Sequence, residues 1–204
     1  MANDSIIEVL PVAVGKYRLG RSLSVEEKDY LNSLEHRPNT ANVTTVNTHV
    51  LDNPVMQDIR SFISRYIDEY VARTNPVEGY NLRFVITQSW LNITKANQHH
   101  PSHYHPNSLL SGVFYVQASA AKDAITFSNP FATPAFRYVS SKKTKYNSQE
   151  IEIPVETGML LIFPSTLWHG VKPKNDNSIR VSLAFNVFVK GTLGKNEYLD
   201  ELIV

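Results

Sequence analysis

Apolar residues recur every three or four positions in one long segment of the chain and alternate with polar residues in several short ones. The first pattern covers residues 53–75 and predicts an amphipathic helix with one buried face. Asn53-Pro54 places proline in the first turn of this helix, and Asn75-Pro76 ends it. The stripe that the helix is expected to bury consists of Val55, Ile59, Phe62, Ile63, Tyr66, Ile67, Tyr70 and Val71.

Two further elements are expected nearer the start of the chain. Residues Ile6–Val14 have the apolar character of an opening strand. Ser24 and Glu27 then have the spacing of a capping box, in which each side chain satisfies a backbone N–H of the other residue. This pair predicts a short helix that ends near Arg37-Pro38.

From Tyr80 onward the pattern changes to short strands separated by turn residues. Such strands, with helices confined to the front of the chain, predict a mainly β fold: a double-sheet jelly roll supported by N-terminal helices on one face. We expect one domain with a mixed lead-in (1–79), a jelly-roll core (80–190) and a C-terminal tail (191–204). The expected strands are Leu82–Ile93, Ser111–Ala118, Ala124–Ser128, Glu150–Pro154, Met159–Phe163 and Ile179–Val189.

Composition narrows the possible chemistry. The chain has 204 residues and no cysteine, so any metal must be held by His, Asp or Glu. Its 20 basic and 19 acidic residues give a net charge of +1, which implies no broad attraction to nucleic acid or to a membrane surface. The first residues lack the pattern of a signal peptide, and no apolar run approaches the roughly 20 residues that span a bilayer. We therefore expect a cytoplasmic protein.

The segment QHHPSHYHP (98–106) holds four of the seven histidines. If it is extended, His103 and His105 lie on one face, where two neutral imidazoles can chelate a divalent transition metal. The alternative is an exposed histidine-rich loop. A metal site therefore needs a third ligand from elsewhere in the chain.

The best candidate for that third ligand is His169, in GMLLIFPSTLWHGV (158–171). This histidine follows a buried strand and a Pro-Ser turn. A jelly roll commonly brings such a strand beside one that comes much earlier in the chain. The alternative is a core imidazole that makes a single hydrogen bond.

A turn at Lys174–Asn177 and a returning strand follow His169. If the two strands form a hairpin, Arg180 returns close to the position opposite His169. Alternation then puts a cation, a hydroxyl and an amide on the metal-facing side, and an arginine there suits a carboxylate held by two hydrogen bonds. The alternative for Arg180 is a surface ion pair. The residues expected on that face are Arg180, Ser182, Ala184 and Asn186.

Taken together, HYHPNSLLSGVFYV (103–116), FPSTLWHGV (163–171) and RVSLAFN (180–186) resemble the 2-oxoglutarate- and Fe(II)-dependent oxygenase superfamily. The sequence is most similar to an uncharacterised bacterial and bacteriophage subgroup that is distantly similar to prolyl hydroxylases. The resemblance covers about the C-terminal half of the chain. It implies a double-stranded β-helix, in agreement with the jelly roll expected from the pattern, and a cytoplasmic location in the host if a phage encodes the protein.

The resemblance also implies roles for individual residues. The Fe(II) ligands would be His103, His105 and His169, and the cosubstrate 2-oxoglutarate would be bound by Arg180, Ser182 and Tyr115. Tyr115 has the alternative of an ordinary aromatic residue in the sheet. Most of the superfamily has Asp or Glu where this chain has His105, so the sequence predicts an unusual three-histidine site, with His100 as a possible substitute ligand.

Two other functions fit parts of the pattern. One is a cupin-like three-histidine metal enzyme that does not use 2-oxoglutarate, although it would not need a buried Arg180. The other is a non-catalytic jelly-roll module for binding or structure. The primary substrate, whether a small molecule or a peptide, and the oligomeric state do not follow from the sequence. The basic segment 140–150 is expected to be a surface loop, with closure over a substrate as the alternative.

Overall fold

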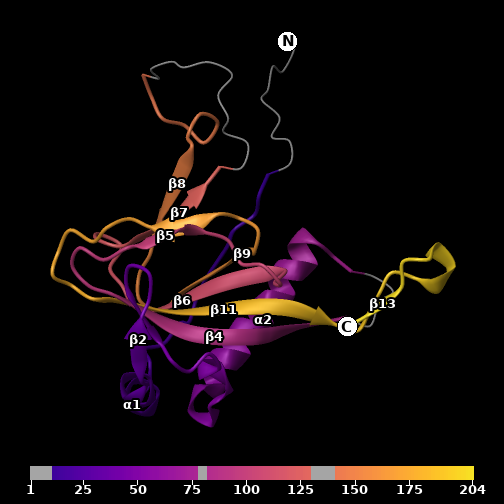
Figure 1. Cartoon of the computed structure of the whole chain (residues 1–204), viewed down its shortest axis with the longest axis horizontal. Helices are drawn as coiled ribbons and strands as arrows, with labels where there is room; N and C mark the ends of the chain where they lie inside the picture. Colours follow the sequence, from indigo (N-terminus) through magenta and orange to yellow (C-terminus); the bar gives the residue numbers. More distant parts are fainter. Residues whose placement is uncertain (1–10, 78–81, 130–140) are drawn as a thin grey trace.

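The computed structural model describes residues 11–77, 82–129 and 141–204, and these form a mainly β fold with two facing antiparallel sheets (Figure 1). The expected strand Ile6–Val14 lies mostly outside the described residues. The predicted double-stranded β-helix is confirmed by this sheet architecture. None of the helices in the described ranges has both the length and the apolar surface needed to cross a lipid bilayer.

The larger sheet has seven strands and joins the front of the chain to its C-terminal half. Its order is β1 (Gly15–Arg18), β9 (Met159–Pro164), β6 (Leu110–Gln117), β11 (Arg180–Lys190), β4 (Arg83–Thr94), β3 (Val43–Thr45) and β2 (His36–Pro38). The long central strand β11 pairs antiparallel with β4 on one side and β6 on the other.

The smaller sheet has four strands, and a short two-stranded ribbon lies near the C-terminus. The smaller sheet runs β5 (His100–His103), β10 (His169–Val171), β7 (Ala124–Ser128) and β8 (Glu150–Pro154), and the ribbon pairs β12 (Thr192–Leu193) with β13 (Leu202–Ile203). The strands predicted at Ala124–Ser128 and Glu150–Pro154 have the predicted bounds. The histidine-rich segment considered as extended forms β5 only as far as His103, and the strand end expected at His169 is the separate three-residue strand β10.

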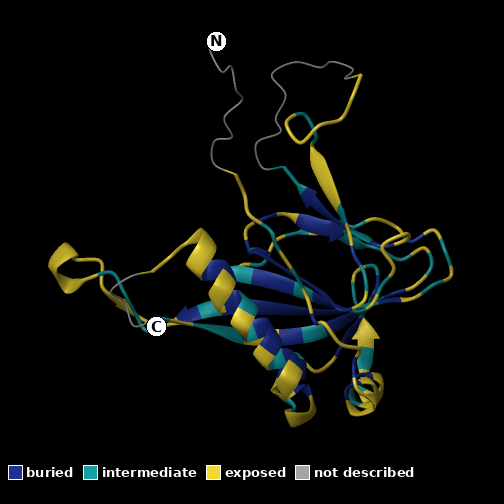
Figure 2. Ribbon diagram, turned by 180° about the vertical axis from the view of Figure 1, so that it is seen from behind, coloured by how far each residue is buried: buried dark blue, intermediate teal, exposed yellow. Residues whose placement is uncertain are grey.

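Helix α2 (Gln57–Thr74) lies across the outer face of the larger sheet, and Figure 2 shows the buried stripe along it. Its buried residues pack against Leu183, Phe185 and Val187 of β11, which alternate with the inward-facing residues of that strand. Phe185 also packs so close to β6 that a Cβ atom on Gly112 would lie 2.1 Å from its ring. This contact explains the glycine there.

Both predicted helices form, with corrections at their ends. Helix α1 (Val25–Ser33) has the predicted capping box at Ser24 and Glu27, but it stops before Arg37-Pro38, because that segment is strand β2. The second helix begins as a short 3₁₀ turn, η2 (Pro54–Met56), before α2. Val55 in that turn is exposed rather than buried. Two other 3₁₀ turns are η1 (Val50–Asp52) and η3 (Asn196–Tyr198).

The predicted hairpin from His169 to Arg180 is wrong. Strand β10 belongs to the smaller sheet and β11 to the larger one, so the intervening turn crosses between sheets. The two residues face one cavity from opposite sheets, since both line it. A second apolar cluster, which includes Tyr115, Ile125 and Phe163, packs around this interior.

Candidate active site

The structure brings together the three histidines that the sequence analysis selected. His103 ends β5, His105 follows it in the next turn, and His169 begins β10, directly opposite His103 in the antiparallel pair. One ligand nitrogen from each histidine lies within 4.8 Å of the other two. The cluster therefore has the composition and closeness of a metal site, and it contains no carboxylate among the described residues.

Backbone carbonyls fix how two of these imidazoles face the cluster. The Nδ1 atom of His103 lies 2.8 Å from the carbonyl oxygen of Pro101, and the Nδ1 atom of His169 lies 2.9 Å from that of Leu167. A carbonyl can only accept, so each Nδ1 carries the proton and each Nε2 keeps a lone pair. Metal-binding histidines commonly donate their second ring nitrogen in this way.

The spacing of the nitrogens also fits a metal ion. The Nε2 atoms of His103 and His105 are 3.1 Å apart. Two metal–nitrogen bonds of about 2.1 Å at a right angle would place their nitrogens about 3.0 Å apart. The pair thus has the separation that adjacent ligands of one transition-metal ion require.

Burial keeps two of these imidazoles, those of His105 and His169, uncharged near neutral pH. It lowers the pKa of His105 to about 4 and the pKa of His169 to about 3, with smaller contributions from the neighbouring histidines. A neutral imidazole is the form that binds metal. The site is therefore ready for a cation without first releasing protons from these two residues.

A network of polar side chains holds His105, which lies outside any strand. Asn186 of β11 hydrogen bonds to the His105 side chain and accepts from Ser111 Oγ at 3.0 Å. Ser111 Oγ is also 2.9 Å from Ser165 Oγ, and the His105 backbone N–H donates to the Ser165 carbonyl at 3.0 Å. On the cavity side, Trp90 stacks on His105 with ring centroids 5.8 Å apart. The sequence analysis placed Asn186 on this face but missed the two serines.

Arg180 lines the same cavity from the opposite sheet and is only 3% exposed. Its Nη2 donates to Thr94 Oγ1 at 2.9 Å, while its Nε has no acceptor among the described residues. No carboxylate in the described ranges forms an ion pair with it, so the surface ion pair considered as an alternative is not observed. Burial lowers the pKa of the guanidinium, as expected for a charge removed from water.

A row of polar side chains crosses the larger sheet next to Arg180. Ser182 of β11 is in register with Tyr115 of β6 and with Asn92 of β4, and all three line the cavity. Burial raises the pKa of Tyr115, so its hydroxyl stays protonated and can donate. Asn92 was missed by the sequence analysis, and its Oδ1 is buried without a partner among the described residues. The alternation of Asn92 and Thr94 with apolar neighbours in WLNIT is the signal that could have identified it.

His100, the substitute ligand considered from the sequence, lies beside the cluster rather than in it. It lines the cavity, and its ring stacks on His103 with centroids 4.4 Å apart and an angle of 14°. The converging group consists of His103, His105 and His169. All six residues predicted to bind metal or cosubstrate thus line one cavity. His103 and His169 lie on the smaller sheet, His105 lies in the connection after β5, and Arg180, Ser182 and Tyr115 lie on the larger sheet.

A comparison with protein families matches the part of the chain that contains the six cavity residues. Residues 88–186, just under half of the chain, match a family model described as "Putative 2OG-Fe(II) oxygenase". A comparison with curated proteins gives no match.

Solved structures share the fold at low sequence identity. HygX from Streptomyces hygroscopicus, with nickel and 2-oxoglutarate bound, is 12% identical, with a TM-score of 0.58 over 86% of this chain and 82% of that one. The viral collagen prolyl hydroxylase of Paramecium bursaria Chlorella virus-1 is 11% identical, with a TM-score of 0.54 over 85% and 94%. A Pseudomonas putida prolyl-4-hydroxylase is 11% identical, with a TM-score of 0.55 over 86% and 92%.

Proposed function

We propose that this chain is a 2-oxoglutarate- and Fe(II)-dependent oxygenase that hydroxylates a substrate. The family match and the shared fold support this proposal. In it, each of the six cavity residues has a role. His103, His105 and His169 hold Fe(II). Arg180 binds the distal carboxylate of 2-oxoglutarate, and Ser182 and Tyr115 donate hydrogen bonds to the cosubstrate.

The donor set supports iron as the metal. Three neutral imidazoles suit a divalent first-row metal, and three protein ligands leave other coordination positions free for a cosubstrate and oxygen. Most of the superfamily uses two histidines and one carboxylate, so His105 in place of the acid removes one negative charge from the site. Asn186 and Ser111 hold His105 in this position through their hydrogen bonds.

The single observation that carries the proposal is the buried Arg180 in the same cavity as the three histidines. An uncompensated buried cation is unfavourable, and a carboxylate held by charge-assisted hydrogen bonds is the natural complement of a guanidinium. A metal enzyme that uses no 2-oxoglutarate has no need of such a group. This observation favours the oxygenase over the cupin-like alternative.

When bound, iron and 2-oxoglutarate would supply the hydroxylation of a substrate C–H bond by dioxygen, with one oxygen atom entering the product, the other entering succinate, and carbon dioxide released. The chain itself positions these groups. Arg180, oriented by its hydrogen bond to Thr94, would fix one end of the cosubstrate, while Trp90 and Phe163 contribute apolar surface that keeps water from the cavity. Tyr115 remains a neutral donor because burial raises its pKa.

The test is anaerobic calorimetric titration of 2-oxoglutarate into protein loaded with Mn(II), a redox-stable substitute for Fe(II). Wild type should bind, and Arg180→Met should weaken binding by about 100-fold or more, because it removes one partner of a buried charge pair. Arg73→Met replaces an exposed arginine of α2 that pairs with Glu69, and it is the matched control. It should bind as wild type does.

The same experiment separates the alternatives. His169→Ala should remove stoichiometric Mn(II) together with 2-oxoglutarate binding. One equivalent of Mn(II) bound without any affinity for 2-oxoglutarate would contradict the proposal and favour the cupin-like enzyme. Binding of neither would leave a non-catalytic module.

A further inference from the structure

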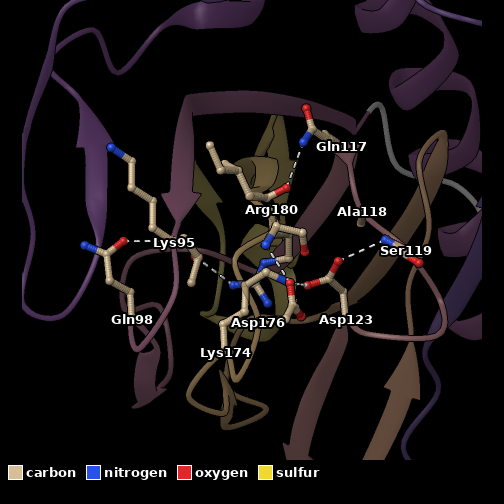
Figure 3. Close-up of polar contacts among 12 residues, drawn as sticks. Lys95, Gln98, Gln117, Ala118, Ser119, Asp123, Lys174, Asp176 and Arg180 are labelled. Carbon is tan, nitrogen blue, oxygen red and sulfur yellow. Dashed lines mark hydrogen bonds and ion pairs between the residues drawn. The ribbon is translucent and has the colours of Figure 1, made fainter.

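Lys174 is a second buried cation, in the connection between β10 and β11. Its Nζ lies 2.8 Å from Asp123 Oδ1 and 3.3 Å from Asp176 Oδ2. The side chains of Lys174 and Asp123 are 3% and 4% exposed, so this is an ion pair removed from solvent. Figure 3 shows the three side chains meeting at one point.

The ion pair between Lys174 and Asp123 holds together three turns of the fold at one end of the cavity. The Lys174 backbone N–H donates to the carbonyl of Gln98 at 3.0 Å, and the Lys174 carbonyl accepts from the N–H of Asn97 at 2.8 Å. Asp123 Oδ2 accepts from the backbone N–H of Ser119 at 2.9 Å (Figure 3). The turns after β4, β6 and β10 therefore meet at the ion pair, and both oxygens of Asp123 are engaged.

Asp123 belongs to the same end of the cavity as Arg180. Gln117, at the end of β6, is in register with Val181 and donates to the carbonyl of Ile179 at 2.9 Å, so the connection that carries Asp123 starts beside Arg180. Ile125, two residues after Asp123, lines the cavity together with Arg180. Burial lowers the pKa of Arg180, and the negative charge of Asp123 acts in the opposite direction. Asp123, two residues before Ile125, is thus a buried carboxylate whose charge acts on the guanidinium although no ion pair joins the two.

We propose that Lys174 is a positioning residue for the anion site: by pairing with Asp123 it keeps this carboxylate away from Arg180, so that Arg180 remains free for the carboxylate of a ligand. The inference rests on the proposed function, because it concerns the affinity of Arg180 for 2-oxoglutarate. It gives the buried ion pair a role beyond joining three turns.

A purely structural pair and a positioning pair predict different results in a double-mutant cycle. Lys174→Met leaves Asp123 buried without its cation, and the carboxylate then turns to Arg180. Asp123→Asn removes the competitor and leaves Lys174 with Asp176 as a partner. The double variant Lys174→Met/Asp123→Asn has neither charge, and Arg180 is free again. If the pair is purely structural, the double variant should bind 2-oxoglutarate no more tightly than Lys174→Met does.

The experiment measures the Kd of 2-oxoglutarate for wild type and the three variants, loaded with Mn(II) under anaerobic conditions. Lys174→Met should raise the Kd about tenfold or more, the equivalent of one lost hydrogen bond between charged groups. Asp123→Asn and the double variant should stay within about twofold of wild type or bind more tightly. The Kd of Mn(II) should not change in any variant, because the histidines are untouched.

Several outcomes would overturn the inference. One is a Lys174→Met variant that binds 2-oxoglutarate as wild type does, which means that the freed carboxylate becomes protonated instead. Another is a double variant as weak as Lys174→Met. If Lys174→Met does not fold, Lys174→Gln replaces it in the cycle. The glutamine removes the positive charge but keeps a hydrogen-bond donor for Asp123. Failure of wild type itself to bind 2-oxoglutarate would reject the proposed function, a result distinct from these.

Discussion

Lys174 and Arg180 are the two cationic side chains buried among residues 11–77, 82–129 and 141–204, and they are compensated in opposite ways. Lys174 meets two carboxylates from its own chain, Asp123 and Asp176. Arg180 meets a hydroxyl, that of Thr94, and its Nε has no acceptor in the described ranges. A buried charge is tolerated when it is paired. The first cation is therefore complete within the fold, and the second is the one that our proposal completes with a ligand.

The positions of the two cations explain this difference. Lys174 lies where three turns meet and backbone groups hold it on both sides. Arg180 lies at the start of a central strand and faces a cavity whose other wall carries the histidines. Two residues six positions apart thus have separate tasks in our proposals: Lys174 joins the turns and restrains Asp123, and Arg180 binds the ligand.

The contrast between Lys174 and Arg180 is tested most strongly by the stability of the variants in which methionine replaces each of them. Lys174→Met should lower the free energy of unfolding by about 3 kcal/mol, which is at the low end of the range for breaking a buried ion pair. The loss should be this small because Arg180 becomes an alternative partner for Asp123. Arg180→Met should be neutral or stabilising, since it removes a charge without breaking an ion pair. Urea unfolding of the metal-free variants measures both. Equal destabilisation by the two substitutions would contradict the contrast.

Ligand-dependent stability sharpens the same contrast. With Mn(II) present, 2-oxoglutarate at about 100 times its Kd should stabilise wild type by about 2.7 kcal/mol. Arg180→Met should gain almost nothing, and the double variant Lys174→Met/Asp123→Asn should gain as much as wild type. Thermal unfolding with and without 2-oxoglutarate provides the measurement. A gain retained in Arg180→Met would show that the ligand binds elsewhere.

The sequence was sufficient to predict the chemistry of the cavity but not its geometry. His103 and His105 stood out as an alternating pair in a histidine-rich segment, and His169 and Arg180 stood out as ionisable residues beside or in an apolar strand. Their arrangement across two sheets did not follow, because β10 has three residues and the turn after it changes sheet rather than closing a hairpin. The roles of the histidines as iron ligands and of Arg180 on 2-oxoglutarate remain predictions.

Contacts between distant residues were the other part that the sequence could not supply. Asn92 meets Ser182 only through strand register, and Lys174 meets Asp123 from 51 positions away. Neither contact has a local pattern. The local signals worked well by contrast: the capping box at Ser24 and the apolar stripe of α2 both formed, because they depend on neighbours within one helix.

Acid should destabilise the metal-free protein by protonating its buried histidines. These histidines are uncharged in the folded protein, whereas Lys174 and Arg180 are buried with their charge. Burial lowers the pKa of His105 to about 4 and of His169 to about 3, from an ordinary 6.5. The unfolded chain therefore binds protons at a higher pH than the folded chain. The stability is fully present above pH 6.5 and is lost as the pH falls towards 4 for His105 and towards 3 for His169, by about 1.4 kcal/mol per pH unit for each histidine.

Urea unfolding at a series of pH values measures this slope. His169→Gln removes one titrating group and should reduce the slope of unfolding free energy against pH by the contribution of one histidine. A slope unchanged in that variant would mean that other groups cause the acid sensitivity. Added Mn(II) should make the loss steeper, because protons then also displace the metal.

The smallest effects are expected from the two hydroxyls beside Arg180. Ser182→Ala and Tyr115→Phe each remove one donor from the row that crosses the sheet, and each should weaken 2-oxoglutarate binding by about 1 kcal/mol, or roughly fivefold. This loss is far below that of Arg180→Met, because a neutral hydrogen bond contributes less than a charged one. Calorimetric titration of both variants tests the ranking. If Tyr115→Phe binds as wild type does while Ser182→Ala does not, Tyr115 is an ordinary aromatic residue of the inner cluster, and the anion site consists of Arg180 and Ser182. The contrast between the two buried cations would survive that result, because it depends on the charge of Arg180 and not on its neutral neighbours.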